Sequence, residues 1–244
     1  MYLQDYIWFA CALLVCALLA GFASSKVHST FSRYDKVANR SGMTGYDTAI
    51  RLMRANDVQG IHVGRVSGML SDHYDPKNGV VNLSQSTYGN ASVAAVAVAA
   101  HEMGHVMQKQ RGYVFYKIRT ALVPVVNFGS RLALPLVLLG LIIDIITATA
   151  TSSVGFYIAL IGVVLYGGSF LFTLITLPVE LNASRRAKKM LAAEGILGDD
   201  ELQGASKVLS AAAMTYVAAM LTSLIYFLRF FVYVLTMFGR RNSK

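Results

Sequence analysis

Charged residues are scarce in this chain of 244 residues: only 14% are charged, while 55% are hydrophobic. Soluble domains carry about 25% charged residues, so the composition argues against a soluble protein and predicts a membrane protein. Charge is missing from residues 6–24 and 154–178, and residues 132–150 contain one aspartate. A helix needs about 20 residues to cross the hydrocarbon core. A fourth apolar run, residues 211–239, is interrupted by Arg229, so we expect three to four transmembrane helices.

Cysteine is also rare, and both cysteines, Cys11 and Cys16, lie in the first apolar run. Their helical spacing and a reducing cytoplasm argue against a disulfide, so we interpret them as small apolar residues. Lys and Arg are absent from the flank "MYLQD" that precedes this run, although a cleaved signal peptide needs positive charge there. Residues 6–24 are therefore expected to form a retained membrane helix.

Basic-aromatic motifs typical of nucleic-acid binding are absent as well, despite a net charge of +9. Residues 25–121 contain twelve Lys or Arg, residues 179–210 contain five, and the loop "TSSVG" at 151–155 contains none. Lys and Arg gather on the cytoplasmic side of membranes, near anionic lipid. The expected partner is thus the lipid bilayer rather than nucleic acid, with both long segments cytoplasmic. The tail "GRRNSK" fits poorly, because four spans would place it outside.

Between the first two spans, the sequence predicts a small α+β domain. A capping box at Thr44 and Asp47 starts a helix. Alternation of apolar and polar residues predicts strands at residues 61–66 and 80–84. Residues 71–79, which include Asp-Pro and Asn-Gly, are typical of a turn. Together these pieces predict a small sheet packed on a helix.

The next helix is expected at residues 91–110, with Asn90 or Ser92 as its N-cap and Gly112 after its end. Its first ten residues are small and apolar on every side, which indicates a helix buried within protein. Residues 112–131 then lead to the membrane, and we expect an amphipathic helix at the interface there.

The buried helix carries the stretch "AAHEMGHVMQ" at residues 99–108. His101 and His105 are four positions apart and share one helix face, so both imidazoles can bind one tetrahedral zinc ion. Glu102 points away from that axis and can act as general base on a zinc-activated water. The pattern favours zinc binding over an ordinary buried polar pair.

A catalytic zinc usually has three protein ligands and a water. Glu180, in "LPVELNASRRAKKM", follows the third span directly and would lie on the same side of the membrane as His105. We therefore expect Glu180 to be the third ligand, with His73 as the alternative. If Glu180 is not a ligand, it is an interfacial residue paired with Arg185 or Arg186.

The remaining roles have candidates too. Tyr216 and Arg185 could stabilise the oxyanion of the reaction, although Tyr216 could equally be a packed aromatic residue. Asn182 or Asp72 could accept a hydrogen bond from a zinc-binding imidazole. The strand at 80–84 could pair with an extended substrate, or serve a structural purpose only.

Five stretches resemble the YugP-like neutral zinc metallopeptidases, integral membrane proteins of bacteria: "SDHYDPKNGVVNLS", "VAAHEMGHVMQ", "ALVPVVNFGS", "TLPVELNASRRA" and "GASKVLSAAAMTYVAA". The resemblance implies a cytoplasmic-facing protease with His101, His105 and Glu180 on zinc and Glu102 as base. The layout is also similar to the HtpX-type membrane proteases. That group usually has an Asp four residues beyond the ligand Glu, where this chain has Ser184.

The sequence thus predicts a mainly α membrane protein with a small, cytoplasmic, zincin-like α+β catalytic domain. We expect it to be a zinc endopeptidase of the cell membrane that cuts peptides or membrane proteins near the inner surface. We expect the first transmembrane helix at residues 1–25 and the catalytic region at residues 26–127. A transmembrane hairpin follows at residues 128–178, and a segment with the third ligand at residues 179–210. Residues 211–244 form a C-terminal apolar region with a basic tail.

Two other functions stay open. An intramembrane zinc protease of the site-2 type is favoured by the apolar residues 91–100, but such enzymes take an aspartate ligand from an Asp-Gly motif, which is absent here. A non-catalytic scaffold stabilised by zinc is the second alternative. Glu102 argues against it, because a structural zinc site has no use for a base.

Overall fold

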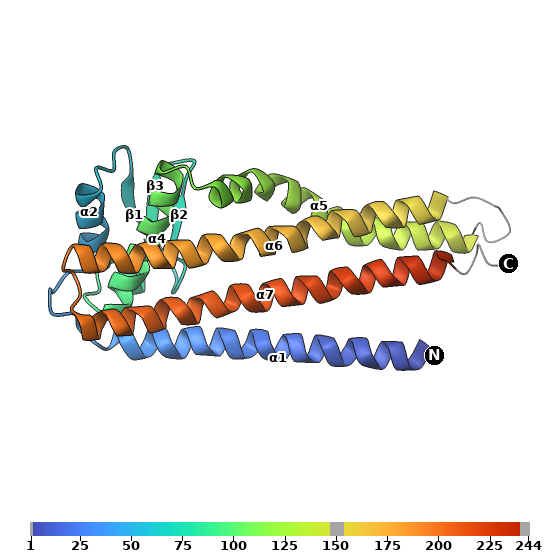
Figure 1. The fold of residues 1–244 in the computed structure, drawn as a ribbon, viewed down its shortest axis with the longest axis horizontal. Helices are drawn as coiled ribbons and strands as arrows, with labels where there is room; N and C mark the ends of the chain where they lie inside the picture. Colours follow the sequence, from blue (N-terminus) through green and yellow to red (C-terminus); the bar gives the residue numbers. More distant parts are fainter. Residues whose placement is uncertain (1, 147–153, 240–244) are drawn as a thin grey trace. The chain divides into compact units, whose positions relative to one another are not determined.

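The computed structural model describes residues 2–146 and 154–239 and is mainly helical, as the sequence predicts (Figure 1). The expected outside loop and the basic tail fall mostly beyond these residues, as do residues 147–150 of the second expected span. The elements, in chain order, are α1 (Tyr2–Asp35), α2 (Gly45–Ala55), β1 (His62–Val66), β2 (His73–Asp75), β3 (Val80–Ser84), α3 (Gln85–Tyr88), α4 (Val93–Gln110), α5 (Val114–Ile146), α6 (Val154–Ala193) and α7 (Asp199–Gly239).

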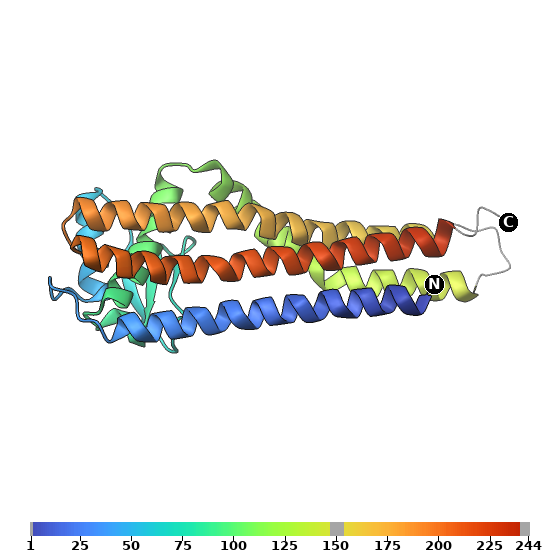
Figure 2. The same cartoon turned by 60° about the horizontal axis from the view of Figure 1, so that its bottom comes forward.

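Four described helices, α1, α5, α6 and α7, are long and apolar enough to cross a membrane. Over residues 112–131 we expected an amphipathic helix at the membrane interface, ahead of the second span. In the structure these residues belong to α5, which runs without a break from Val114 through Pro124 and Pro135, and the interfacial position of its first turns stays a prediction. Proline is tolerated inside membrane helices because neighbouring groups satisfy the backbone atoms it leaves unpaired. Helices α6 and α7 are likewise continuous in both views (Figures 1 and 2).

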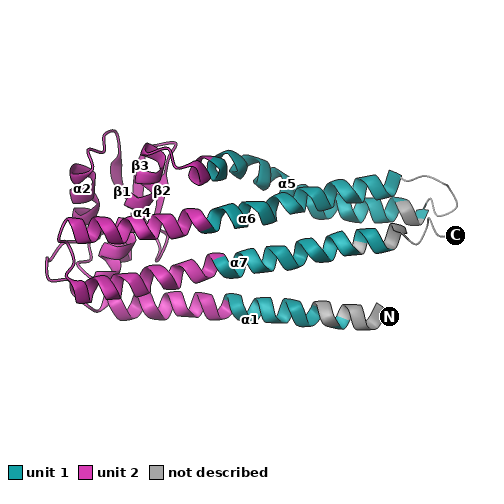
Figure 3. Cartoon of the chain, in the orientation of Figure 1, with its two compact units in different colours: residues 1–20, 118–177, 217–244 teal, residues 21–117, 178–216 magenta. Residues whose placement is uncertain are grey.

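The chain forms two compact units (Figure 3). Unit 1 comprises residues 1–20, 118–177 and 217–244. Its helices approach closely at Gly140, where an added Cβ would lie 2.5 Å from the Gly155 carbonyl oxygen. Small residues allow such contacts between membrane helices. Large apolar side chains of unit 1 are exposed, which suits contact with lipid; they include Leu14, Phe128, Tyr157 and Val164.

Unit 2 comprises residues 21–117 and 178–216 and holds the small sheet. The strand order is β1-β3-β2, with β3 parallel to β1 and antiparallel to β2. The strand at 80–84 is therefore the central strand. Its residues 80–82 pair with β1 on one side and β2 on the other, so they cannot also pair with an extended substrate. The expected turn at 71–79 contains β2 instead, which forms an edge of the sheet. Alternation within one strand does not reveal the long-range pairing that sets this order.

Helix α4 lies in the core of unit 2, as its small apolar residues predict. Ala94, Ala97 and Ala100 have no exposed surface. The Ser92 hydroxyl caps the helix by accepting a hydrogen bond from the Ala95 amide (3.1 Å). The predicted capping box of α2 is also present, with Thr44 and Asp47 bonded reciprocally. Because most residues of α4 are buried within unit 2, packing fixes the positions of the side chains that it carries.

Candidate metal centre

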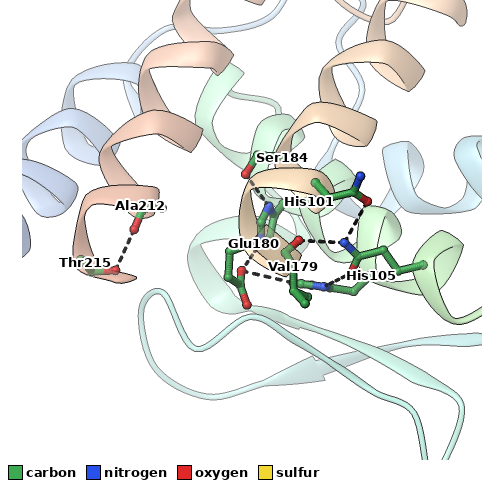
Figure 4. A network of polar contacts seen from close by, with 9 residues as sticks. His101, His105, Val179, Glu180, Ser184, Ala212 and Thr215 are labelled. Atoms are coloured by element: carbon green, nitrogen blue, oxygen red, sulfur yellow. Dashed lines mark hydrogen bonds and ion pairs between the residues drawn. The ribbon is translucent and has the colours of Figure 1, made fainter. Parts of the chain in front are cut away.

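Helices α4 and α6 bring His101, His105 and Glu180 together (Figure 4). The Nε2 atoms of His101 and His105 lie 3.2 Å and 3.4 Å from the same carboxylate oxygen, Oε2 of Glu180. Glu180 is 2% exposed, so this carboxylate is almost fully removed from water. The three side chains converge although 75 residues separate the second histidine from the glutamate in the sequence.

The local sequence explains this convergence. The four-residue spacing places both imidazoles on one face of α4, with ring centroids 4.8 Å apart. Gly104, between them, brings α6 close, because an added Cβ would lie 2.5 Å from the Ala183 carbonyl oxygen. Only a residue without a side chain allows this contact between helices, and the contact holds Glu180 over the two histidines.

A buried glutamine determines which nitrogen of His105 carries a proton. The amide nitrogen of Gln108 donates to the Val179 carbonyl oxygen (2.7 Å) and to Oδ1 of Asn182 (3.1 Å). Its oxygen Oε1 therefore faces Nδ1 of His105, at 3.0 Å. An amide oxygen only accepts hydrogen bonds, so Nδ1 carries the proton. When this imidazole carries no second proton, its Nε2 presents a lone pair to the Glu180 carboxylate.

The lone pair on Nε2 of His105 and the lone pairs of the Glu180 carboxylate then face each other, so a positive charge between them is needed to offset their repulsion. A single proton would bridge Glu180 to one imidazole only, whereas a metal ion can accept electron pairs from His101, His105 and Glu180 together. Tetrahedral bonds of about 2.0–2.2 Å place neighbouring ligand atoms about 3.3–3.6 Å apart. Two of the three pairs lie at 3.2 Å and 3.4 Å, and all three ligand atoms lie within 4.8 Å of one another. The residues fit a zinc ion, and two imidazoles with one carboxylate are a common ligand set for a catalytic zinc.

Glu102 lies beside these three residues but is not one of them. It is 6% exposed, and burial raises the pKa of its carboxyl group to about 7. The nearby carboxylates of Glu180 and Asp72 add to this increase, while His101 and the Tyr74 backbone amide oppose it. A carboxyl group whose pKa lies near neutrality is suited to exchange protons at physiological pH.

Strand β2 lies next to Glu102. The backbone amide of Tyr74 lies near the Glu102 carboxylate and opposes the increase in its pKa. Lys109 of α4 fixes the same strand: its Nζ donates to the Pro76 carbonyl oxygen (2.6 Å) and lies 5.8 Å from the centre of the Tyr74 ring. The edge strand is thus held against α4 at the residue expected to act as base.

The other candidates lie as follows. His73 contacts the Ser71 carbonyl oxygen and Asn82 rather than the three converging residues, and Asp72 accepts hydrogen bonds from the amide and hydroxyl of Ser84. Arg185 is exposed on α6, and Tyr216 is half-buried on α7. The structure does not test the proposed oxyanion roles of Arg185 and Tyr216, which stay predictions.

Two further side chains contact the histidines, Gln108 and Ser184, and neither was expected from the sequence to do so. The Ser184 hydroxyl lies 3.1 Å from Nδ1 of His101, so it contacts an imidazole of the candidate centre from the position that is Asp in the HtpX-type group. Asn182 reaches His105 only through Gln108. Gln108 lies three residues after His105, so helical spacing places it on the same face and could have identified it.

A comparison with protein families supports a zinc-dependent chemistry for this centre. Residues 9–235 match the family described as "Putative neutral zinc metallopeptidase". The chain belongs to this family. It is also 43% identical to the "Putative membrane protease YugP" of Bacillus subtilis (strain 168), over 89% of this chain and 93% of that protein. No solved structure matches the chain.

Proposed function

We propose that the protein is a membrane-embedded zinc endopeptidase whose active centre faces the cytoplasm. The observation that carries this proposal is the convergence of His101, His105 and Glu180, with the buried carboxyl group of Glu102 beside them. Membership of a zinc metallopeptidase family supports it. The expected substrates are peptides or membrane proteins near the inner surface.

The proposed roles follow from the positions of the side chains. His101, His105 and Glu180 would hold the metal, and Gln108 would keep His105 in the tautomer that binds it. Zinc, when bound, lowers the pKa of water and polarises the carbonyl group of the peptide bond. Glu102 would take a proton from the attacking water and transfer it to the leaving amine.

The edge strand β2 offers a place for the substrate backbone. Tyr74 pairs with Val81 of β3 in the antiparallel ladder, and its amide lies near Glu102. This suits a residue whose backbone groups point away from β3, and its carbonyl group would then lie on the same open edge. We expect it to accept a hydrogen bond from an extended substrate, as exposed strand edges do in other complexes with peptides.

An intramembrane centre of the site-2 type is disfavoured by the position of the motif. H-E-x-x-H lies on α4, which is not among the four described helices that could span a membrane. A purely structural zinc site is disfavoured by Glu102, because a buried carboxyl group that binds no metal destabilises such a site.

The direct test is proteolysis by the purified full-length protein in detergent. Wild type should cleave an unstructured fluorescent peptide pool, and Glu102→Gln should reduce the rate by about 10²- to 10⁴-fold while keeping its zinc. Asp57→Asn, which changes an exposed carboxylate of the same unit, serves as the control and should retain full activity. Equal activity in Glu102→Gln and wild type would contradict the proposed base.

The membrane face can be tested separately. In a chain without Cys11 and Cys16, single cysteines would replace Lys77, in the turn after β2, or Thr151, in the loop between the second and third expected spans. A membrane-impermeant maleimide should label position 151 in intact cells and position 77 only after the membrane is opened. The reverse pattern would place the active centre outside.

A further inference from the structure

A basic pocket lies within unit 2, where α2 and α4 end beside α6. Its volume is about 500 Å³, which is in the range of small-molecule sites. Four cationic side chains line it: Arg111, Arg185, Arg186 and Lys189. None of His101, Glu102, His105 and Glu180 lines this basic pocket, although Asn182, which does, also accepts a hydrogen bond from Gln108.

The positive charge of the basic pocket is not balanced by the described part of the chain. Its described lining includes one carboxylate, Glu194, which already pairs with Arg51 (3.6 Å between Nε and Oε2). Among the described residues, no ion pair involves any of the four cations. The C-terminal ends of α2 and α4 contribute about half a negative charge each. An excess of positive charge is left in a concave site.

One of these cations is held in place. Nε of Arg186 donates to Oδ1 of Asn182 at 2.7 Å, and no described residue accepts a hydrogen bond from its two Nη groups. Arg111 lies near enough for the two guanidinium groups to repel each other. An anion bound between them would relieve this repulsion and use donors whose orientation is already fixed.

We propose that the basic pocket binds a phosphate group, carried by a soluble phosphorylated molecule or by the headgroup of an anionic lipid. A phosphate group presents several charged oxygens to several cations at once, and its geometry matches the planar fork of arginine. A carboxylate would engage fewer of the four. Met107 and Met190 provide apolar walls for the part of the ligand next to the phosphate group.

Both sources can reach the basic pocket. Arg185 lies seven residues beyond Pro178, the last residue of the third expected span, which is about 10 Å along α6. The polar layer of one leaflet is about 5–8 Å thick, so a headgroup at its outer surface comes close to Arg185. A soluble phosphorylated molecule would reach the same side chains from the cytoplasm.

The test compares ligand binding by full-length, metal-replete protein and its variants. Inorganic phosphate would be titrated calorimetrically into wild type, Arg111→Gln/Lys189→Gln and the control Lys207→Gln, which removes an exposed cation outside the basic pocket. Loss of a charge-assisted hydrogen bond weakens binding by about tenfold or more. We expect that loss in the double variant only.

A second arm identifies a lipid source. The same proteins in nanodiscs of phosphatidylcholine, with or without phosphatidylglycerol, would be compared by thermal unfolding, because a ligand that binds the folded state raises the transition temperature. Stabilisation by phosphatidylglycerol that is lost only in the double variant supports the lipid source, and phosphate binding lost only there supports the soluble source. If neither arm distinguishes the double variant from Lys207→Gln, the proposal is wrong.

Discussion

The two units differ in the size of their buried cores and in what those cores contain. In unit 2 a large apolar core includes the completely buried Leu83 and Val96, and the buried polar groups of the metal centre have named partners. In unit 1 the buried cluster is smaller, and large apolar side chains such as Phe128 and Val164 are exposed. Unit 1 thus has the surface of a membrane domain, whereas the larger core of unit 2 can hold a fixed array of polar groups.

A site of buried polar groups needs surroundings that can form hydrogen bonds with all of them. A polar network in low dielectric costs free energy unless each group is satisfied. Unit 2 satisfies Gln108 with three hydrogen bonds, and this network holds His105. The following predictions test how strongly unit 2 depends on close helix packing and on hydrogen bonds to its buried polar groups.

The largest effect is expected from a methyl group between α4 and α6. Gly104→Ala places Cβ 2.5 Å from a backbone oxygen that cannot move alone, so we expect a loss of about 3 kcal/mol in the free energy of unfolding and weaker zinc binding. Gly168→Ala, in unit 1, meets nothing within 4 Å and should change stability by less than about 1 kcal/mol. Thermal unfolding in detergent and zinc titration measure both. Similar results for the two variants would contradict the close contact between α4 and α6 at Gly104.

A smaller effect is expected from the loss of the hydrogen bonds of Gln108. Gln108→Leu leaves Nδ1 of His105 and the Val179 carbonyl oxygen without their partner, so zinc affinity should fall by about 10- to 100-fold. Gln110→Leu changes an exposed residue of the same helix and is the matched control. Competition with a chromophoric chelator gives both affinities. Unchanged affinity in Gln108→Leu would show that the orientation of His105 does not depend on this network.

The smallest effect is a pH dependence in the zinc-free protein. The folded-state pKa of Glu102 is raised from 4.5 to about 7 by burial, so the folded state binds a proton more tightly than the unfolded state. This contribution is fully present below about pH 4.5 and is lost as pH rises through about 7. Between about pH 5.5 and 7.5, wild type should lose about 2 kcal/mol relative to Glu102→Gln. The free energy of unfolding of both proteins is measured over this pH range in the presence of a chelator. If it changes equally with pH in wild type and Glu102→Gln, the buried environment assigned to Glu102 is wrong.

Much of the fold follows from local signals in the sequence. Length and apolar composition predict the membrane helices, and a run of small residues predicts the burial of α4. The spacing of His101 and His105, with the position of Glu180 after the third span, points to three residues that the structure brings together. These signals lie within single elements, which is why they can be read directly.

The features that the sequence did not reveal depend on contacts between distant segments. The central position of β3 requires its parallel pairing with β1, and β2 is only three residues long. Gln108 has a role because Val179 and Asn182 of α6 lie beside it. The continuity of α5 through both of its prolines also has no local signal in the sequence.

Zinc content of the purified full-length protein tests the central claim most directly. Elemental analysis of wild type, His105→Ala, Glu180→Ala and His73→Ala after metal-replete purification should give about one zinc per chain in wild type and His73→Ala. The other two variants should lose it. Zinc-free wild type would contradict a metal centre on α4 and α6, and loss in His73→Ala with retention in Glu180→Ala would contradict the proposed third ligand.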